Sequence, residues 1–260
     1  MLLAFASNAP AQTPAAPPRI TASKVILVGD STTAVIGGWG PSFCADHVTS
    51  FMACVNLGRG GRSSGSYIAE GSWDLALSEM RTPGYKNVWV LIQFGHNDQP
   101  GKPGRSTDLA SEFPANLRRY VSEARQAGAK PVLVTPLTRR IFVDGTLDND
   151  LAPWAEAIRW VAAEMDVPLV DLNARSVAAV QALGETASNG FAQLPEGSVP
   201  VGPPPSGGAR GTEVAVMPTA VPKLSFDRTH LGRFGADFFA AMVTAELVRA
   251  VPEMRPNLLP

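Results

Sequence analysis

Residues 24–34 read KVILVGDSTTA, and their character changes abruptly in the middle. A short run of apolar and β-branched residues, typical of a buried strand, ends at Gly29 and is followed by an acid and three hydroxyl residues. We interpret this run as the first strand of the fold and ask what its polar turn does.

Four more short runs resemble this strand. They are ACVNL (53–57), KNVWVLIQF (86–94), KPVLV (130–134) and VPLVDL (167–172), and each is predicted to be a fully buried strand. The stretches between them have the apolar spacing of amphipathic helices. Three helical faces are predicted: Phe113, Leu117, Val121 and Ala124; Trp154, Ile158, Val161 and Met165; and Phe234, Phe238, Ala241 and Ala245.

This alternation of strands and helices predicts the fold class. Strands that are separated by helices run parallel, with right-handed crossovers and with helices on both faces of the sheet. We predict one doubly wound α/β domain, residues 23–252, around a five-stranded parallel sheet. Ligands of such sheets bind beyond the carboxyl ends of the strands. The polar residues that follow each strand are therefore the candidates for a site.

The composition restricts the partners of this domain. The chain has 260 residues, of which 45% are hydrophobic, and this is enough for a sizeable core. Its 22 basic and 23 acidic residues nearly cancel, which argues against binding to nucleic acid or to an anionic membrane. No window approaches about 18 consecutive apolar residues, so no membrane span is predicted. A small or neutral partner is favoured, and we expect a monomer.

Both ends of the chain and one internal segment lie outside the domain pattern. Residues 1–22 begin with MLLAFASNAPAQTPAAPP, which is typical of an incomplete export signal followed by a flexible tether and favours a secreted or periplasmic protein. A flexible tail is the alternative, because no Lys or Arg precedes Arg19. Residues 195–222 are rich in proline and glycine and are predicted to be a loop insertion. Residues 253–260 are predicted to be a C-terminal tail.

The chain has only two cysteines, Cys44 and Cys54. In an exported protein they can form a disulfide, and two isolated buried thiols are the alternative. They form no CxxC metal or redox motif. The sequence leaves both states open.

Polar residues gather at the predicted strand ends. They are Gly29-Asp30-Ser31 after the first strand, residues 56–63 after the second, Gly95-His96-Asn97-Asp98 after the third, and Asp227-Arg228-Thr229-His230 before the last helix. Taken singly, each has an ordinary structural role: a serine after a strand is commonly a helix N-cap, and an Asn-Asp pair is commonly a turn. A shared chemical role has to come from the set.

The set contains the groups that acyl transfer requires, namely a nucleophile, a base, a group that orients the base, and donors for the oxyanion. Ser31 is the candidate nucleophile. Asp227 and His230 are three residues apart, so one short turn can bring the carboxylate to one imidazole nitrogen and leave the other nitrogen for the serine.

Three groups are candidates for the oxyanion donors. The backbone N–H of Ser31 is one, and Gly61 offers another N–H without a side chain that blocks the approach. Asn97 offers its carboxamide N–H. Asp30 is expected to brace the turn rather than to join the triad, because its side chain points away from that of its neighbour.

These residues resemble a known family. GDS near the N-terminus, a lone glycine in the second block, GxND and a C-terminal DxxH are similar to the four blocks of the SGNH (GDSL-type) hydrolases, in the same order and over nearly the whole chain. More narrowly, GDST, GGRSSGSY (60–67), QFGHNDQ (93–99) and DRTHLGRFGA (227–236) resemble the rhamnogalacturonan acetylesterases of carbohydrate esterase family 12.

This resemblance implies a flavodoxin-like three-layer α/β/α fold and the removal of acetyl groups from pectin-type polysaccharides. It implies that Ser31, Asp227 and His230 form the triad, and that Gly61 and Asn97 join the Ser31 amide as the oxyanion hole. No metal or other cofactor is expected.

Several residues are candidates for substrate contact. Arg139 and Arg140 follow the fourth strand, where two guanidinium groups can bind the carboxylates of a uronate-containing polymer. Pairing with an acid at 144, 148 or 150 is the alternative. Arg62 is a third candidate, or else a structural arginine. Three tryptophans lie in helix-like stretches and are interpreted as packing residues rather than sugar-stacking residues; they are Trp39, Trp73 and Trp154. The 195–222 loop is a candidate wall of the cleft, and a mobile decoration is the alternative.

Four other functions remain as alternatives. A lipase or arylesterase and an acetylxylan esterase would use the same triad. A dinuclear-metal phosphoesterase would also gather Asp, Asn and His at strand ends, but three histidines are few for that purpose. A carbohydrate-binding protein without catalysis would result from a misaligned triad.

Overall fold

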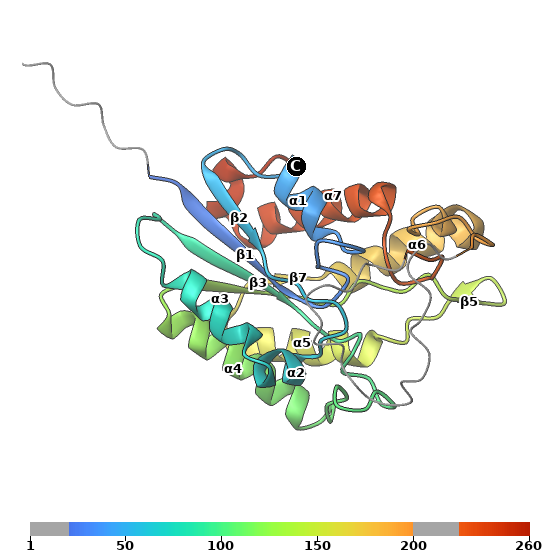
Figure 1. The fold of residues 1–260 in the computed structure, drawn as a ribbon, viewed down its shortest axis with the longest axis horizontal. Coiled ribbons are helices and arrows are strands. Elements are labelled where there is room, and N and C mark those ends of the chain that lie inside the picture. The colour runs from blue at the N-terminus through green and yellow to red at the C-terminus, as the bar shows by residue number, and fades with distance from the viewer. Residues whose placement is uncertain (1–20, 200–223) are drawn as a thin grey trace, which may run out of the picture.

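A five-stranded sheet forms the centre of the protein in a computed structural model, which describes residues 21–199 and 224–260. Its strands are β1 (Ser23–Gly29), β2 (Met52–Asn56), β3 (Val88–Gln93), β4 (Lys130–Val134) and β7 (Leu169–Val170). All neighbours pair in parallel, in the order β2-β1-β3-β4-β7 (Figure 1). The predicted sheet is confirmed. The predicted leader 1–22 and the predicted loop 195–222 lie almost entirely outside the described residues.

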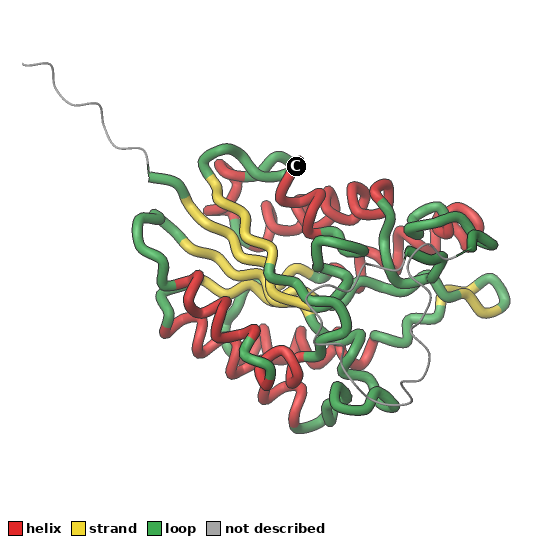
Figure 2. The backbone as a smooth tube through the Cα atoms, viewed as in Figure 1, coloured by secondary structure: helices red, strands yellow, loops and turns green. Residues whose placement is uncertain are grey.

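Helices cover both faces of this sheet (Figures 1 and 2). One face carries α1 (Gly40–Asp46), α6 (Leu172–Asn189) and α7 (Arg233–Ala250). The other carries α2 (Ser64–Ala69), α3 (Ser72–Met80), α4 (Glu112–Gln126) and α5 (Ala152–Glu164). Side chains along β1 alternate between the two cores: Val25 and Leu27 face α7, and Ile26 and Val28 face α4. The doubly wound α/β fold is confirmed.

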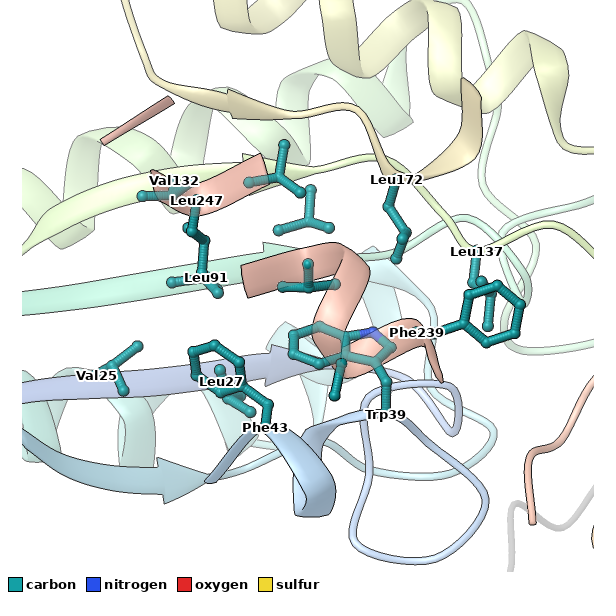
Figure 3. Close-up of a cluster of buried hydrophobic side chains, with 14 of the residues drawn as sticks. Val25, Leu27, Trp39, Phe43, Leu91, Val132, Leu137, Leu172, Phe239 and Leu247 are labelled. Carbon is teal, nitrogen blue, oxygen red and sulfur yellow. The ribbon is translucent and has the colours of Figure 1, made fainter. Parts of the chain in front are cut away.

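Figure 3 shows the core between the sheet and α7. In this view Trp39, from the turn before α1, lies between Phe43 of α1 and Phe239 of α7, and all three belong to one core with Leu27 and Leu91 of the sheet. Trp39 and Trp73 are fully buried and Trp154 is nearly so, which confirms that the tryptophans pack rather than face a substrate.

The predicted face of the last helix is wrong. Phe234 is 66% exposed, and the buried face of α7 instead contains Ala236, Phe239, Ala240, Val243 and Leu247. Phenylalanines lie on two sides of this helix, and the ring of Phe191 takes up the second side by stacking on Phe238. The spacing of the aromatic residues therefore did not distinguish the face that packs on the sheet.

The C-terminal residues are not a tail. They form the short 3-10 helix η1 (Pro252–Asn257), and Met254 and Leu258 are buried in the α7 core. Leu258 also makes a β-bridge to Val48. The prediction for residues 253–260 is therefore wrong, because two apolar side chains fix this segment against the domain.

Smaller features complete the described fold. Cys44 and Cys54 form a disulfide that joins α1 to β2. A hairpin of β5 (Phe142–Val143) and β6 (Thr146–Leu147) lies after β4. Within residues 21–199 and 224–260, none of the helices combines the length and the apolar character needed to cross a bilayer.

The strand order locates the site. After β1 the chain crosses one face through α1 to reach β2, and after β3 it crosses the other face through α4 to reach β4. The two crossovers diverge beyond the carboxyl ends of β1 and β3, and this switch point is where open α/β sheets bind ligands. Ser31 follows β1 and Asn97 follows β3, so the two candidates lie at this point.

Candidate active site

The buried side chain of Asp30 fixes the turn that carries Ser31. This carboxylate is fully buried, and its Oδ1 accepts from the backbone N–H and from the hydroxyl of Thr32, both at 2.8 Å. His96 Nδ1 lies 3.3 Å from the other oxygen. Burial alone would raise the pKa of Asp30, but His96 and the Thr32 hydrogen bonds outweigh it and hold this pKa below its usual range. Asp30 therefore braces the turn, as predicted.

The same turn is joined to β3 by a residue that the sequence analysis did not single out. Gln93 Nε2 donates to the Thr32 hydroxyl at 2.5 Å, and Gln93 Oε1 accepts from Trp39 Nε1 at 2.8 Å. All three side chains are buried. Thr32 thus connects the turn of Ser31 to the strand that precedes Asn97.

Three N–H groups point to an oxyanion hole. Within the described residues, the backbone N–H groups of Ser31 and Gly61 have no acceptor. Gly61 has a φ of +79°, a conformation that favours glycine. A Cβ on the preceding Gly60 would lie 3.7 Å from the Ser31 Cβ, so this loop runs beside the serine.

Asn97 stands next to the same loop. Its Nδ2 donates to the carbonyl of Arg62 at 3.0 Å, which keeps one N–H of the carboxamide for a ligand. Arg105 Nη1 lies 3.4 Å from both Asn97 Oδ1 and Gly61 O, and it fixes the carboxamide with its nitrogen on the donor side.

The residue after Asn97 is a buried acid. Asp98 accepts from the Ser64 hydroxyl at 2.6 Å and from the Thr107 hydroxyl at 3.0 Å. Burial raises the pKa of Asp98 to about 6 in spite of these hydrogen bonds. This carboxyl joins the start of α2 and the loop before α4 to the turn after β3.

Asp227 and His230 form the predicted pair. His230 Nδ1 lies 2.9 Å from Asp227 Oδ2, and Asp227 Oδ1 accepts from the backbone N–H groups of Thr229 and His230 at 2.7 and 2.6 Å. Partial burial would raise the pKa of Asp227, but the hydrogen bonds and charge of His230 hold it well below its usual range. The carboxylate is therefore charged and oriented toward the imidazole.

This pair rests on the loop that begins at Ser31. Leu231 N donates to Gly37 O at 2.9 Å, and a Cβ on Gly37 would lie 3.1 Å from Cδ2 of His230. No hydrogen bond joins the Ser31 hydroxyl to His230 in the described part of the chain. Catalytic hydrogen bonds are often long before a substrate binds. The structure thus brings together the loops of the predicted triad and pairs two of its members.

Comparison with known proteins identifies the family. A sequence model described as GDSL-like Lipase/Acylhydrolase family matches residues 27–194, which include Ser31, Gly61 and Asn97. The chain belongs to this family. It is therefore an ester hydrolase, and the predicted resemblance to SGNH hydrolases is confirmed.

Two relatives from Bacillus subtilis (strain 168) are similar to this hydrolase. The protein named "Probable rhamnogalacturonan acetylesterase YesY" is 32% identical over 183 residues, which cover 68% of this chain and 82% of the relative. "Rhamnogalacturonan acetylesterase RhgT" is 37% identical over 169 residues, which cover 62% of this chain and 69% of the relative. Both names agree with the narrower resemblance.

A solved structure supports the fold. The crystal structure of protein YXIM_BACsu from Bacillus subtilis superposes with a TM-score of 0.65 at 21% identity. The alignment covers 88% of this chain and 57% of that protein, so the hydrolase spans little more than half of its length. At this level of identity the likeness shows a common fold alone.

Arg140 does not face the substrate side of this hydrolase. Its side chain is 0% exposed, and its Nη2 donates to the carbonyls of Asp227 and His230 at 2.8 and 3.0 Å, with Nη1 3.4 Å from Thr229 O. Its backbone N–H donates to Arg228 O at 2.8 Å. The prediction of substrate contact is therefore wrong. The chain turns inward after β4, and the buried Arg140 holds the turn that contains Asp227 and His230.

The other two predicted arginines have carboxylate partners. Arg139 is 12% exposed and pairs with Asp150, one of the alternatives that the sequence offered. Arg62 Nε lies 2.9 Å from Glu70. Contact of either residue with a substrate stays a prediction.

A cavity of about 620 Å³ lies beside Asp227. Its lining includes Phe142, Phe226, Asp227, Arg228 and Thr229. This volume is in the usual range of about 300–1,000 Å³ for ligand sites. The aromatic and charged lining gives a substrate room beside Asp227.

Proposed function

We propose that this hydrolase is a serine acetylesterase that removes acetyl groups from pectic rhamnogalacturonan, as a member of carbohydrate esterase family 12. The observation that carries the proposal is the Asp227–His230 pair, with 2.9 Å between Nδ1 and Oδ2, held against the loop of Ser31 at the switch point of the sheet. The identities of 32% and 37% to two proteins named as rhamnogalacturonan acetylesterases support the substrate class.

The first step forms an acyl-enzyme. Ser31 Oγ attacks the acetyl carbonyl carbon while its proton moves to Nε2 of His230. Asp227 keeps the other ring proton on Nδ1 and stabilises the imidazolium. The oxyanion accepts hydrogen bonds from the amides of Ser31 and Gly61 and from Asn97 Nδ2. Collapse of this intermediate breaks the ester bond, and His230 gives its proton to the departing sugar oxygen.

The second step releases acetate. His230, neutral again, takes a proton from water, and the resulting hydroxide attacks the acyl carbon on Ser31. The same three donors stabilise the second oxyanion, and the proton returns to Ser31 Oγ when acetate leaves. These steps require no metal or other cofactor.

The protein is further proposed to act in pectin degradation outside the cytoplasm, secreted or periplasmic. The export-like residues 1–22 support this location. The disulfide between Cys44 and Cys54 also supports it, because disulfides persist in oxidising compartments. One chain supplies every residue of the proposed site, which supports a monomeric enzyme.

Acetate release from a panel of polymers tests the substrate. The panel contains acetylated rhamnogalacturonan, acetylated xylan and a neutral acetylated mannan, with Ser31→Ala as the inactive control. Faster release from rhamnogalacturonan supports the proposal, and faster release from xylan favours the acetylxylan esterase instead.

Two further measurements separate the remaining alternatives. A series of 4-nitrophenyl esters from acetate to octanoate should show a steep fall beyond two carbons, whereas a flat profile indicates a lipase or arylesterase. A fluorophosphonate probe should label Ser31 in the unaltered protein and not in Ser31→Ala. An unlabelled Ser31 would indicate a binding protein without catalysis.

A further inference from the structure

The candidate nucleophile lies in a closed turn after β1. Asp30 begins this turn, and its carbonyl accepts from the backbone N–H groups of Thr33 at 3.2 Å and of Ala34 at 3.0 Å. Ser31 is the second residue of the turn. Hydrogen bonds that close so short a segment make its residues move together. The position of Ser31 therefore depends on the position of Asp30.

The candidate oxyanion donor lies in a similar turn after β3. Gly95 begins it, and the backbone N–H of Asp98 donates to the carbonyl of Gly95 at 3.2 Å. Asp98 Oδ2 also accepts from the N–H of Gly95 at 3.1 Å, which closes the turn a second time. His96 and Asn97 are its two central residues. A displacement of His96 therefore displaces Asn97 as well.

The side chain of His96 joins this second turn to the first. His96 is 3% exposed, and its Nδ1 lies 3.3 Å from Oδ2 of the fully buried Asp30. Among residues 21–199 and 224–260, no other carboxylate lies within 4.0 Å of this imidazole, and neither ring nitrogen has a hydrogen bond to any other residue. A buried nitrogen without a partner lowers stability, and an apolar side chain would avoid that cost. The contact with Asp30 is thus what the imidazole adds to this position.

The main chain of His96 is held by two cations. Its carbonyl accepts from Lys102 Nζ and lies 3.4 Å from Arg139 Nη2. The preceding Gly95 has a φ of +142°, and a Cβ there would lie 3.0 Å from Cγ of Pro136. The charged groups that face His96 in the described structure are thus Asp30 at its ring and Lys102 and Arg139 at its carbonyl. The ring and the main chain of this residue are both fixed.

We propose that His96 is a positioning residue, whose ring against Asp30 sets the placement of the oxyanion donor Asn97 relative to Ser31. This role rests on the proposed function, in which Ser31 forms the acyl-enzyme and Asn97 stabilises its oxyanion. Gln93 fixes the first turn to β3 itself, whereas His96 fixes it to the residue directly before Asn97. One buried contact thereby aligns the nucleophile with the donor that follows another strand.

Two substitutions separate this role from simple packing. His96→Asn keeps a donor for Asp30, because Nδ2 of asparagine is as many bonds from Cα as Nδ1 of histidine. It should keep kcat on 4-nitrophenyl acetate within about tenfold, whereas His96→Leu should lose about 100-fold, the loss expected for a displacement of about 1 Å. Leucine is closer to histidine in size, so a packing role predicts the opposite order. That order, or equal losses, would overturn the proposal.

A double-mutant cycle tests the link to the oxyanion donor. If His96 acts through the placement of Asn97, its replacement matters less once the carboxamide is absent. His96→Leu should therefore lower kcat by less than about threefold in the Asn97→Ala protein, compared with about 100-fold in the unaltered protein. Equal losses in the two proteins would overturn the proposal. His96→Gln, which moves the donor one bond further from Cα, replaces His96→Leu in both comparisons if the leucine variant does not fold.

His47→Leu is the matched control. His47 Nδ1 lies 2.7 Å from the carbonyl of Leu259, at the end of α1, and kcat should stay near native. Titration of Ser31 with a fluorophosphonate gives the concentration of active protein in each variant, so an unfolded fraction does not lower kcat. An unaltered protein that neither reacts with this probe nor hydrolyses 4-nitrophenyl acetate would overturn the proposed function. An active enzyme with equal losses in the cycle would overturn the role of His96 alone.

Discussion

Replacement of Arg140 by methionine should slow turnover much more than the same replacement of a remote arginine that also donates to two backbone carbonyls. The guanidinium holds three carbonyls of the turn between Asp227 and His230, and two of these contacts are short, at 2.8 and 3.0 Å. Methionine fills part of the buried space and donates no hydrogen bond. The carbonyls then lose their donor, and the turn that carries the imidazole is free to shift.

The magnitude follows from these contacts. A hydrogen bond from a charged donor contributes about 1.5–3 kcal/mol, so the two short bonds contribute about 3–6 kcal/mol before any cost. Burial of the charge is itself unfavourable, and it lowers the pKa of Arg140 to about 10. We expect the free energy of unfolding to fall by about 2–4 kcal/mol, which is about 5–15 °C in Tm for a chain of this size.

The effect on catalysis is larger than this loss of stability suggests. A displacement of a catalytic group by about 1 Å can cost about 100-fold in rate. We therefore expect kcat on 4-nitrophenyl acetate to fall about 100-fold, with little change in KM, at a temperature well below the melting transition. Arg140→Lys should recover part of the loss, because an ammonium can still donate to one of the carbonyls.

Arg125→Met is the matched control. Arg125 Nη2 also donates to two backbone carbonyls, those of Met165 and Asp166, both at 2.9 Å and far along the sequence from the dyad. Steady-state kinetics and thermal melts followed by circular dichroism are measured on all three variants. A folded Arg140→Met protein with near-native kcat would refute the positioning role, as would an equal fall of kcat in Arg125→Met.

Three other predictions concern the site and its support. Asn97→Ala should fold normally and lower kcat by about 100- to 1000-fold, the usual loss for one oxyanion donor; near-native turnover on 4-nitrophenyl acetate would remove Asn97 from the hole. The pKa of Asp98 is raised to about 6, so between pH 4 and 6 the folded state keeps a proton that the unfolded state has released. The free energy of unfolding should therefore fall by about 2–3 kcal/mol as the pH rises from 4 to 6. Urea titrations should show this slope in the unaltered protein and its loss in Asp98→Asn; equal slopes would contradict the assignment. The double variant Cys44→Ser, Cys54→Ser should lose about 2–3 kcal/mol of stability, as expected for a disulfide that spans 10 residues, and unchanged stability would indicate that the bond constrains the unfolded chain little.

The sheet was predictable because its strands are short apolar runs rich in β-branched residues, whereas the described helices have apolar residues spaced three or four apart. Val25 to Val28 are buried from both sides, so the run is apolar throughout and ends where the site begins. The closeness of the residues after β1 and β3 was predictable for a related reason, since the carboxyl ends of parallel strands meet at one edge of the sheet. The contact between Asp227 and His230 was predictable from their spacing of three residues.

The errors come from long-range contacts. Arg140 follows a strand in the sequence, which predicts a position at the edge of the site. It becomes a buried hydrogen-bond donor only because its loop packs against Asp227, which is 87 residues further along the chain. The face of α7 was misread because Phe238 finds a partner in Phe191 rather than in the sheet. The spacing of apolar residues within a helix does not show which distant residues that helix contacts.

The hydrogen bonds among Asp30, Thr32, Gln93 and Trp39 have a consequence for the dynamics of the turn that carries Ser31. Loops usually open more readily than the strands that they follow. Here the turn after β1 is attached through a buried glutamine to a tryptophan of the α7 core, so it opens only when that core opens. We therefore expect the turn of Ser31 to open together with that core rather than as an independent loop.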